Sequence, residues 1–380
     1  MWRKKPIFVV VQTFNEMKTG ILSAVSSVIL MLAVSCEGNQ YGPTGHRPGQ
    51  EKPEQGTEET GFVKGADISW VTQMEKDGEK FYTADGKETE CTALMKKIGF
   101  DAIRLRVWVG PEGGWCGKDD VLVKAKRAHD LGMKLMIDFH YSDFWADPGK
   151  QNPPAAWKGY GTAEMTAAVA SHTKEVLKAL KGKGIDVAWV QVGNEVTGGM
   201  LWPSGKVEGK STGSFIDYLN AGYAAAKEVY PDTKVILHID NGYDSGQYDW
   251  FFGLMKSGNA RYDIIGMSLY PSYAGNDWNG TVDRCIANIK AVNSKFGKPV
   301  MICETGLPVD QPQQSKETMQ HIVDKAMNTE GCLGVFYWEP QTDGVWKPSN
   351  YAALGWNAYG LGAFSNGRPT VILEPFGNKE

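Results

Sequence analysis

Eight short apolar runs, separated by segments with helical patterning, constrain the fold of this 380-residue chain more than any other feature. The runs predict strands at 63–68, 102–108, 134–140, 187–192, 234–238, 264–269, 299–303 and 334–338. The helical patterns between them lie at 89–98, 119–131, 162–180, 215–229, 248–256, 282–296 and 316–327. This alternation predicts a (β/α)₈ barrel, the TIM barrel. An open doubly wound sheet is the alternative, but the sequence has no glycine-rich phosphate turn.

The first 60 residues differ in composition from the rest. Residues 21–35 form an apolar run that is short for a bilayer span and fits the core of a signal peptide. Lys18 supplies a positive flank, so Met17 competes with Met1 as the start. Residues 36–60 are rich in Gly, Pro, Gln and Glu, as flexible tethers are. We expect a signal peptide at 1–35, a tether at 36–60 and a single barrel domain at 61–380.

The sequence Leu-Ala-Val-Ser-Cys at 32–36 resembles the lipobox of bacterial lipoproteins, in which the cysteine is acylated. Ala33 stands where that pattern usually has leucine. Together with the signal and the tether, Cys36 predicts lipidation and an exported protein anchored at the outer membrane or cell surface. Ordinary secretion is the alternative. The other five cysteines form no CxxC or Cys/His cluster, so we expect no structural zinc site.

Charge and aromatic content narrow the class of partner. The net charge is −4 and no basic patch stands out, so we expect no nucleic-acid partner. The chain contains 13 tryptophans, whose rings suit a site that stacks on flat ligand faces. We expect it to act as a monomer that meets a membrane only through its lipid anchor.

Polar side chains gather where the predicted strands end, which is the catalytic face of a (β/α)₈ barrel. They are Asp67, Arg104, Arg106, Asp138, His140, Asn194, Glu195, His238, Asp240, Tyr270, Glu304, Trp338 and Glu339. Arg104 and Arg106 lie two residues apart and therefore face the same side of their strand. If that side is the barrel interior, both cations need carboxylate partners, for which Glu195 and Glu304 are available. A purely structural ion network is the alternative.

Three long segments after predicted strands carry aromatic side chains. They are 141–161 with Trp145 and Trp157, 200–214 with Trp202, and 339–364 with Trp346, Tyr351 and Trp356. All three would lie at the same end of the barrel as the polar residues. Their rings would form a cleft with several sugar subsites.

Glu195 and Glu304, at two strand ends, suit cleavage of a glycosidic bond. One carboxylic acid protonates the leaving oxygen and the other carboxylate attacks the anomeric carbon, and a separation of about 5–5.5 Å gives retention of configuration. We expect the acid to have a pKa raised by its anionic partner. The nucleophile must stay ionised, which a neighbouring arginine and a tyrosine hydroxyl would favour. The sequence has no GxSxG, P-loop, HExxH or EF-hand pattern.

Several motifs together resemble glycoside hydrolase family 53, the endo-β-1,4-galactanases, within the clan of retaining (β/α)₈ hydrolases. The resemblance runs from about residue 65 to 362. The motifs are Gly-Ala-Asp-Ile-Ser at 65–69, Arg-Leu-Arg-Val-Trp at 104–108, Asp-Phe-His-Tyr-Ser-Asp-Phe-Trp-Ala-Asp-Pro at 138–148, Gln-Val-Gly-Asn-Glu at 191–195, the stretch 238–242, Ser-Leu-Tyr-Pro at 268–271, Glu-Thr-Gly at 304–306 and Tyr-Trp-Glu-Pro at 337–340.

The resemblance implies cleavage of β-1,4-galactan, with Glu195 as acid/base, Glu304 as nucleophile and Arg104 in contact with Glu304. It also implies a set of substrate-binding residues, namely Arg104, Trp108, His140, Asp143, Trp145, Asp147, Asn194, His238, Asp240, Tyr270 and Trp338. Some bacterial members hold calcium in the loop between strands seven and eight. Here 305–334 has no Asp/Asn cluster, so we expect no calcium and no other cofactor.

Two alternatives remain. A hydrolase of the same clan that acts on mannan or xylan would keep both glutamates. A non-catalytic glycan-binding protein of the cell surface would keep the aromatic cleft but lose a carboxylate, and the chain has retained both.

Overall fold

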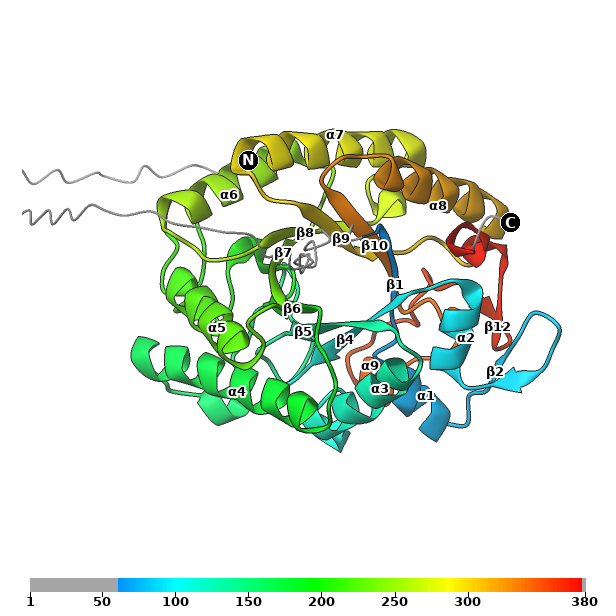
Figure 1. Cartoon of the computed structure of the whole chain (residues 1–380), viewed down its shortest axis with the longest axis horizontal. Coiled ribbons are helices and arrows are strands. Elements are labelled where there is room, and N and C mark those ends of the chain that lie inside the picture. Colours follow the sequence, from blue (N-terminus) through cyan, green and yellow to red (C-terminus); the bar gives the residue numbers. More distant parts are fainter. Residues whose placement is uncertain (1–60, 378–380) are drawn as a thin grey trace, which may run out of the picture. The chain divides into compact units, whose positions relative to one another are not determined.

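Eight parallel strands close into a barrel in the computed structural model, which describes residues 61–377 except for the side chains of 352 and 353 (Figure 1). The barrel strands are β1 (Val63–Asp67), β4 (Ala102–Val107), β5 (Lys134–Phe139), β6 (Trp189–Val192), β7 (Lys234–Ile239), β8 (Ile264–Leu269), β9 (Val300–Thr305) and β10 (Cys332–Trp338). Each pairs with its neighbours in the barrel, and β10 closes onto β1. The predicted (β/α)₈ barrel is therefore confirmed. The predicted signal peptide, Cys36 and tether lie outside the described residues.

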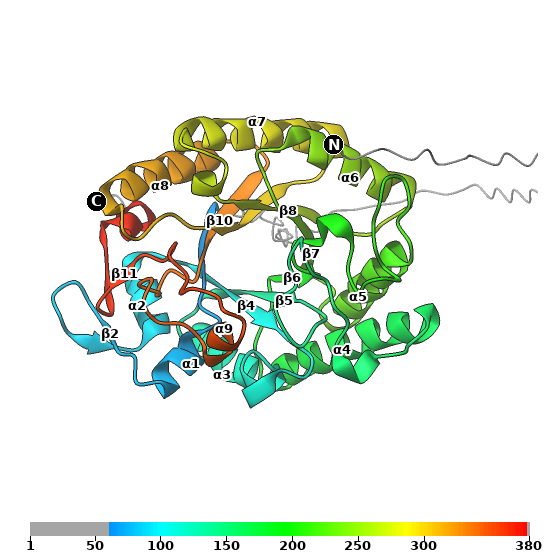
Figure 2. The same ribbon diagram turned by 180° about the vertical axis from the view of Figure 1, so that it is seen from behind.

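Helices surround the barrel, as the two opposite views show (Figures 1 and 2). They are α1 (Val71–Lys76), α2 (Cys91–Ile98), α3 (Lys118–Asp130), α4 (Thr162–Gly182), α5 (Phe215–Val229), α6 (Ser245–Ser257), α7 (Trp278–Phe296), α8 (Pro312–Met327) and α9 (Ser349–Ala353). α6 and α7 start earlier than predicted because the side chains of Asp244 and Asp277 cap their first turns. None of the helices within 61–377 is both long and apolar enough to cross a membrane.

The shortest strands were not predicted from the sequence. Two hairpins, β2 (Phe81–Tyr82) with β3 (Glu88–Thr89) and β11 (Phe364–Ser365) with β12 (Arg368–Pro369), have two residues per strand. Two residues are too few to show an alternating pattern. The described chain ends in a 3₁₀ helix, Val371–Phe376, that packs on α2 and α8.

The barrel interior changes from apolar to polar along its axis. An apolar cluster fills the end where the strands begin, and it consists of Val63, Ala102, Met136, Trp189, Ile236, Ile264, Met301, Cys303 and Phe336. Gly65 belongs here, because a Cβ at that position would lie 2.2 Å from the ring of Phe336. Towards the strand ends, alternate positions carry buried polar side chains, Arg104 and Arg106 among them. The two arginines thus face the interior together, as their spacing predicts.

A β-bulge in β9 directs Glu304 into the barrel. Along β8, Met267 pairs with Ile302 but Ser268 pairs with Glu304, so Cys303 is an extra residue in β9. The pairing of β9 with β10 shifts at the same place. Because Cys303 already contributes to the interior cluster, regular alternation would turn Glu304 towards the helices. The bulge places it on the same side as Ser268 instead, and bulges commonly re-aim side chains in this way beside active sites.

Candidate active site

A cavity of about 220 Å³ opens at the carboxyl ends of the strands. Glu195 and Glu304 both line it, together with His140, Trp145, Ala146, Asp147, Asn194, Tyr270, Tyr273, Trp338, Tyr351, Trp356 and Tyr359. The structure thus places both glutamates and six of the predicted substrate-binding residues around one cavity. Aromatic rings make up most of the rest of the lining.

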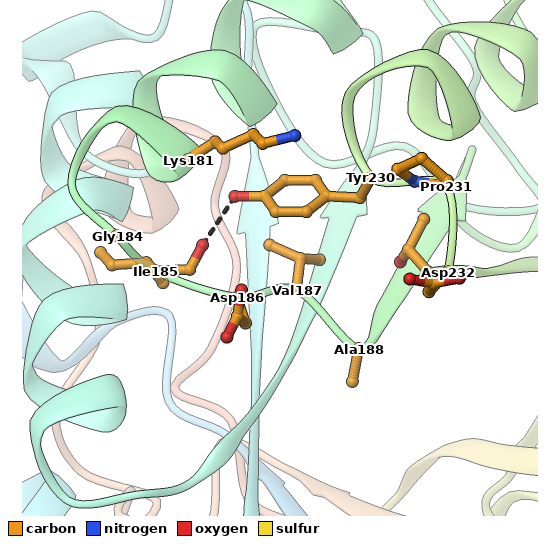
Figure 3. A pocket seen from close by; sticks show the side chains of 10 residues that line it. Lys181, Gly184, Ile185, Asp186, Val187, Ala188, Tyr230, Pro231 and Asp232 are labelled. Atoms are coloured by element: carbon orange, nitrogen blue, oxygen red, sulfur yellow. Dashed lines mark hydrogen bonds between the residues drawn. The ribbon is translucent and has the colours of Figure 1, made fainter. Parts of the chain in front are cut away.

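Another cavity, of about 520 Å³, lies at the opposite end of the barrel (Figure 3). It is formed by the segments that precede β6 and β7. The Tyr230 hydroxyl donates to the carbonyl of Ile185 at 2.6 Å, and the Lys181 ammonium donates to the carbonyl of Val229 at 2.6 Å. Its prominent polar groups therefore hold the chain itself together. In (β/α)₈ enzymes that end of the barrel serves stability rather than chemistry.

Arg104 lies at the centre of the polar interior and is completely buried. Its guanidinium contacts three carboxylates, those of Asp67 at 2.8 Å and of Asp138 and Glu304 at 2.9 Å each. It also donates to the side-chain carbonyls of Asn194 at 2.9 Å and Gln191 at 3.2 Å. The expected contact between Arg104 and Glu304 is confirmed. Arg104 itself lies behind the cavity lining.

Both oxygens of Glu304 receive a donor. Arg104 contacts Oε1, and the Tyr270 hydroxyl donates to Oε2 at 3.0 Å. Burial raises the pKa of Glu304 to about 7, while the charge of Arg104 and the hydrogen bond from Tyr270 act against that rise. These two groups stabilise the ionised form of Glu304.

Glu195 has a different environment. It follows β6 in a left-handed backbone conformation, with φ 45° and ψ 52°, and the side chain of Gln151 donates to the carbonyl of Asn194 at 2.8 Å. Oε1 of Glu195 accepts a hydrogen bond from the Ser268 hydroxyl at 2.6 Å. Burial raises the pKa of Glu195 well above its usual range, and the negative charge of Glu304 adds to this. The protonated form is thus favoured at Glu195, whereas Arg104 and Tyr270 favour the charged form of Glu304.

Arg106 pairs with Glu339 and not with either of the two catalytic candidates. Its guanidinium donates to Oε1 of Glu339 at 2.5 Å, so the suggestion that Glu195 balances one of the arginines is wrong. The guanidinium also lies 5.0–6.0 Å from the ring centres of four tryptophans, Trp70, Trp108, Trp145 and Trp338. This cation holds together the tryptophan cluster from which Trp145 and Trp338 reach the cavity.

His140 and Asn194 are fixed to the same loop. The backbone N–H of Ala146 donates to Nδ1 of His140 at 3.0 Å, so the proton of the ring is on Nε2, which lies 2.9 Å from Asp138. The amide of Asn194 donates to the carbonyl of Ala146 at 2.9 Å. These bonds place both side chains on the cavity wall.

Four further predicted substrate-binding residues do not line the cavity. Trp108 packs behind Trp145, with ring centres 4.7 Å apart. Asp143 accepts backbone N–H groups at 2.8 Å from two loops, Asp240 bonds to Thr197 and Gln247, and His238 is buried in the barrel. Sequence motifs locate these residues near the strand ends but do not show how deep each lies.

The cavity lining includes tyrosines that the candidate set omitted. Tyr273, which is 71% exposed across its surface, follows β8 closely, and Tyr359 lies in the long segment after β10. Tyr351 and Trp356 come from the same segment, which was predicted to supply cleft aromatics. Proximity of Tyr273 to the strand end is the signal that could have identified it.

No group of three or more His, Cys, Asp or Glu side chains within residues 61–377 is arranged to hold a metal ion. The five cysteines in this region are unpaired thiols. The expectation that the protein needs no calcium stays a prediction.

Comparison with known proteins identifies the family. The sequence profile described as glycosyl hydrolase family 53 matches residues 63–368. The chain belongs to glycosyl hydrolase family 53. It is 32% identical over 338 residues to the endo-beta-1,4-galactanase of Bacillus subtilis, covering 79% of this chain and 75% of that protein. It is 32% identical over 314 residues to a probable arabinogalactan endo-beta-1,4-galactanase A of Neosartorya fischeri, covering 77% of this chain and 86% of that protein.

Solved structures agree with this family 53 assignment. A structure from a study of two fungal beta-1,4-galactanases superposes with a TM-score of 0.72 at 27% identity, covering 83% of this chain and 98% of the other. The family 53 catalytic domain of Ignisphaera aggregans gives the same TM-score and identity, with 83% and 96% covered. A Cellvibrio japonicus xylanase, at 13% identity and a TM-score of 0.56, shares the fold alone.

The raised pKa of Glu195 predicts that ionising this residue lowers the free energy of unfolding at high pH. A carboxyl whose pKa is higher in the folded than in the unfolded chain stabilises the fold below about pH 4.5, and that stability is lost as the pH rises through its folded-state pKa. We expect Glu195→Gln to unfold at a higher temperature than wild type at pH 8, because the neutral amide does not have to be ionised inside the folded protein. The gain should shrink towards pH 4.5.

Thermal unfolding followed by circular dichroism across this pH range measures the difference. Exposed Glu228, whose pKa is lowered by its pairing with Lys174, provides the matched control, and Glu228→Gln should give no such gain. A Glu195→Gln protein that is equally or less stable than wild type at pH 8 would contradict the expectation.

Proposed function

We propose that this protein is an endo-acting, retaining hydrolase that cleaves β-1,4-galactosidic bonds in galactan or type I arabinogalactan. The observation that carries the proposal is the unequal environment of two glutamates on one cavity. Arg104 and Tyr270 contact Glu304, while no lysine or arginine within residues 61–377 forms an ion pair with Glu195. Relatives named endo-beta-1,4-galactanase support the choice of galactan.

The unequal environments assign the roles. Glu304 acts as the nucleophile, because Arg104 and Tyr270 stabilise its charged form. Glu195 acts as the acid and donates its proton to the leaving sugar oxygen. Once Glu304 is bonded to the sugar its charge is gone, so the pKa of Glu195 falls and Glu195 can accept a proton from the attacking water.

The cavity lining divides the predicted substrate-binding residues into those that can contact the sugar and those that hold them in position. We assign His140, Trp145, Asp147, Asn194, Tyr270 and Trp338 to the sugar. Arg104, Trp108, Asp143, His238 and Asp240 support them from behind or from the side. The protein acts as a monomer without a metal or other cofactor in this proposal. Because both glutamates are retained, a purely glycan-binding role is disfavoured.

A substrate panel tests the specificity. We expect release of oligosaccharides from β-1,4-galactan and little from β-1,4-mannan or β-1,4-xylan. Proton NMR of the first products should show the β-anomer before mutarotation, because double displacement retains configuration. Preference for mannan or xylan would favour the other clan activities, and an initial α-anomer would exclude the retaining mechanism.

Substitution of each glutamate tests the roles. Glu304→Gln should abolish activity on galactan and on an aryl galactobioside alike, because no covalent intermediate forms. Glu195→Gln should lose about 10²–10⁴-fold on galactan, the usual range for a general acid. It should still react with the aryl substrate, whose leaving group needs little protonation, and azide should restore its turnover with a β-glycosyl azide as product. A β-azide formed by Glu304→Gln, together with an α-azide formed by Glu195→Gln, would reverse the two assignments.

We also propose that the protein is exported and lipidated at Cys36, which would place the barrel at the outer membrane or cell surface. The run at 21–35 and the motif at 32–36 support this. We expect wild type in the membrane fraction of the producing cell and Cys36→Ser in a soluble or unprocessed form. Identical fractionation and processing of the two proteins would indicate ordinary secretion.

A further inference from the structure

Three buried polar side chains form a line of hydrogen bonds that ends on Glu195. The Ser268 hydroxyl lies 2.6 Å from Oε1 of Glu195, and Nε2 of His238 lies 2.8 Å from the Ser268 hydroxyl. Nδ1 of His238 in turn lies 2.9 Å from the amide nitrogen of Gln191. The three residues come from the neighbouring strands β8, β7 and β6 and all point into the barrel. None of them lines the cavity, so none can touch the sugar directly.

Arg104 determines the direction of this line. A guanidinium can only donate hydrogen bonds, so the oxygen of the Gln191 amide must face its Nε, at 3.2 Å. The amide nitrogen of Gln191 then faces His238 and donates to Nδ1. With Nδ1 as an acceptor, the neutral ring carries its proton on Nε2 and donates it to the Ser268 oxygen. Ser268 has one hydrogen left to give, and it goes to Glu195.

The reverse direction leaves a conflict. It requires a proton on Nδ1 of His238, directed at the side-chain oxygen of Asn194 at 3.1 Å. That oxygen already accepts from Arg104 at 2.9 Å and from the Gln191 amide at 3.2 Å, which occupies both of its lone pairs. In addition, two N–H groups would face each other between Gln191 and His238 at 2.9 Å. The reverse direction would also place the proton of Glu195 on Oε1, facing the barrel interior.

We propose that Ser268 and His238 are positioning residues that hold Oε1 of Glu195 as a hydrogen-bond acceptor, so that the catalytic proton is carried by Oε2. The inference rests on the proposed role of Glu195 as acid/base. A carboxyl group with its proton confined to one oxygen needs no rotation before it protonates the leaving group. Such preorganisation is what positioning groups contribute to general acid catalysis.

The surroundings of the line keep it in one state. Three carboxylates face Glu195 and raise its pKa, namely those of Glu304 on β9, Asp240 after β7 and Asp147 after β5. The hydrogen bond from Ser268 lowers the pKa of Glu195. Towards His238 face Arg104, Asp138 and His140.

Burial, with the charge of Arg104, lowers the pKa of His238 well below its usual range, so the ring stays neutral at working pH. The line is thus a fixed donor to Glu195 and not a titrating switch.

The pH profile of kcat/KM tests the proposal through its sign. Removing a donor to the carboxylate raises the pKa of Glu195, so Ser268→Ala should move the alkaline limb of the profile upwards, by about one pH unit. The acid limb, set by Glu304, should stay in place. Activity at the optimum should fall about 10-fold on galactan and less on an aryl galactobioside, whose leaving group needs little protonation.

Two further variants control the experiment. Ser268→Thr keeps a hydroxyl and should keep the wild-type limb. Ser315→Ala, in α8, also removes a buried hydroxyl with one hydrogen bond, to the carbonyl of Pro308 at 2.8 Å, and should leave the profile unchanged.

An unmoved alkaline limb in Ser268→Ala would overturn the proposal. A limb that moves to lower pH would show that Ser268 accepts from Glu195, which is the reverse direction. If the alkaline limb moved as far in Ser315→Ala or in Ser268→Thr as in Ser268→Ala, loss of the hydrogen-bond donor to Glu195 would not be the cause.

A second readout does not depend on catalysis. The difference in unfolding temperature between wild type and Glu195→Gln, followed against pH, reports the titration of Glu195 itself. Repeating the comparison with Ser268→Ala present in both proteins should move that titration to higher pH. If wild type cleaves no β-glycan, the proposed function fails, yet this shift still decides whether Ser268 donates to Glu195.

Discussion

The buried guanidinium of Arg104 is the interaction on which the polar half of the barrel depends. It joins carboxylates from β1, β5 and β9 and, through two amides, reaches the end of β6. Removing such a cation would leave the buried carboxyl groups of Asp67, Asp138 and Glu304 together without their shared partner, and an unpaired buried charge typically costs about 3–5 kcal/mol. The same group stabilises the charge of Glu304 directly and orders the hydrogen bonds that reach Glu195. One side chain therefore influences both carboxyls, in different ways.

A second buried cation has a separate task. Arg106 lies two residues beyond Arg104 on β4 and pairs with Glu339, which follows β10. Its guanidinium is surrounded by indole rings. The barrel interior is thus divided between an arginine that serves the carboxylates and an arginine that serves the aromatic wall. Two arginines separated by one residue on a single strand achieve this division because every second side chain faces inwards.

Much of this arrangement could be predicted from the sequence, because it follows from periodicity. The eight strands and the inward direction of Arg104 and Arg106 follow from alternation. The location of Glu195 and Glu304 at the same end of the barrel follows from parallel topology. What could not be predicted depends on single-residue events. The bulge at Cys303 leaves no signal in a run of apolar residues, and the partner of Arg106 is decided by strand register.

Depth within the barrel was also beyond the sequence. His238 and His140 both occur near strand ends, yet one is enclosed by Gln191 and Ser268 while the other reaches the cavity. A histidine in a motif fits either of two roles, a direct contact with the sugar or a hydrogen-bonded support for Glu195. Only the contacts separate the two roles.

The charges of the cavity also determine which sugars can enter it. Among the described residues that line it, the acidic side chains are Asp147, Glu195 and Glu304, and no lysine or arginine belongs to the lining. A uronic acid would bring its own carboxylate against these groups, and Lys150, which lies over the ring of Trp356, is already paired with Asp147. The low local dielectric strengthens repulsion between like charges. Neutral hexoses and pentoses meet no such barrier. In the proposed function, selection against acidic polysaccharides would therefore rest on the same carboxylates that are assigned to the cleavage.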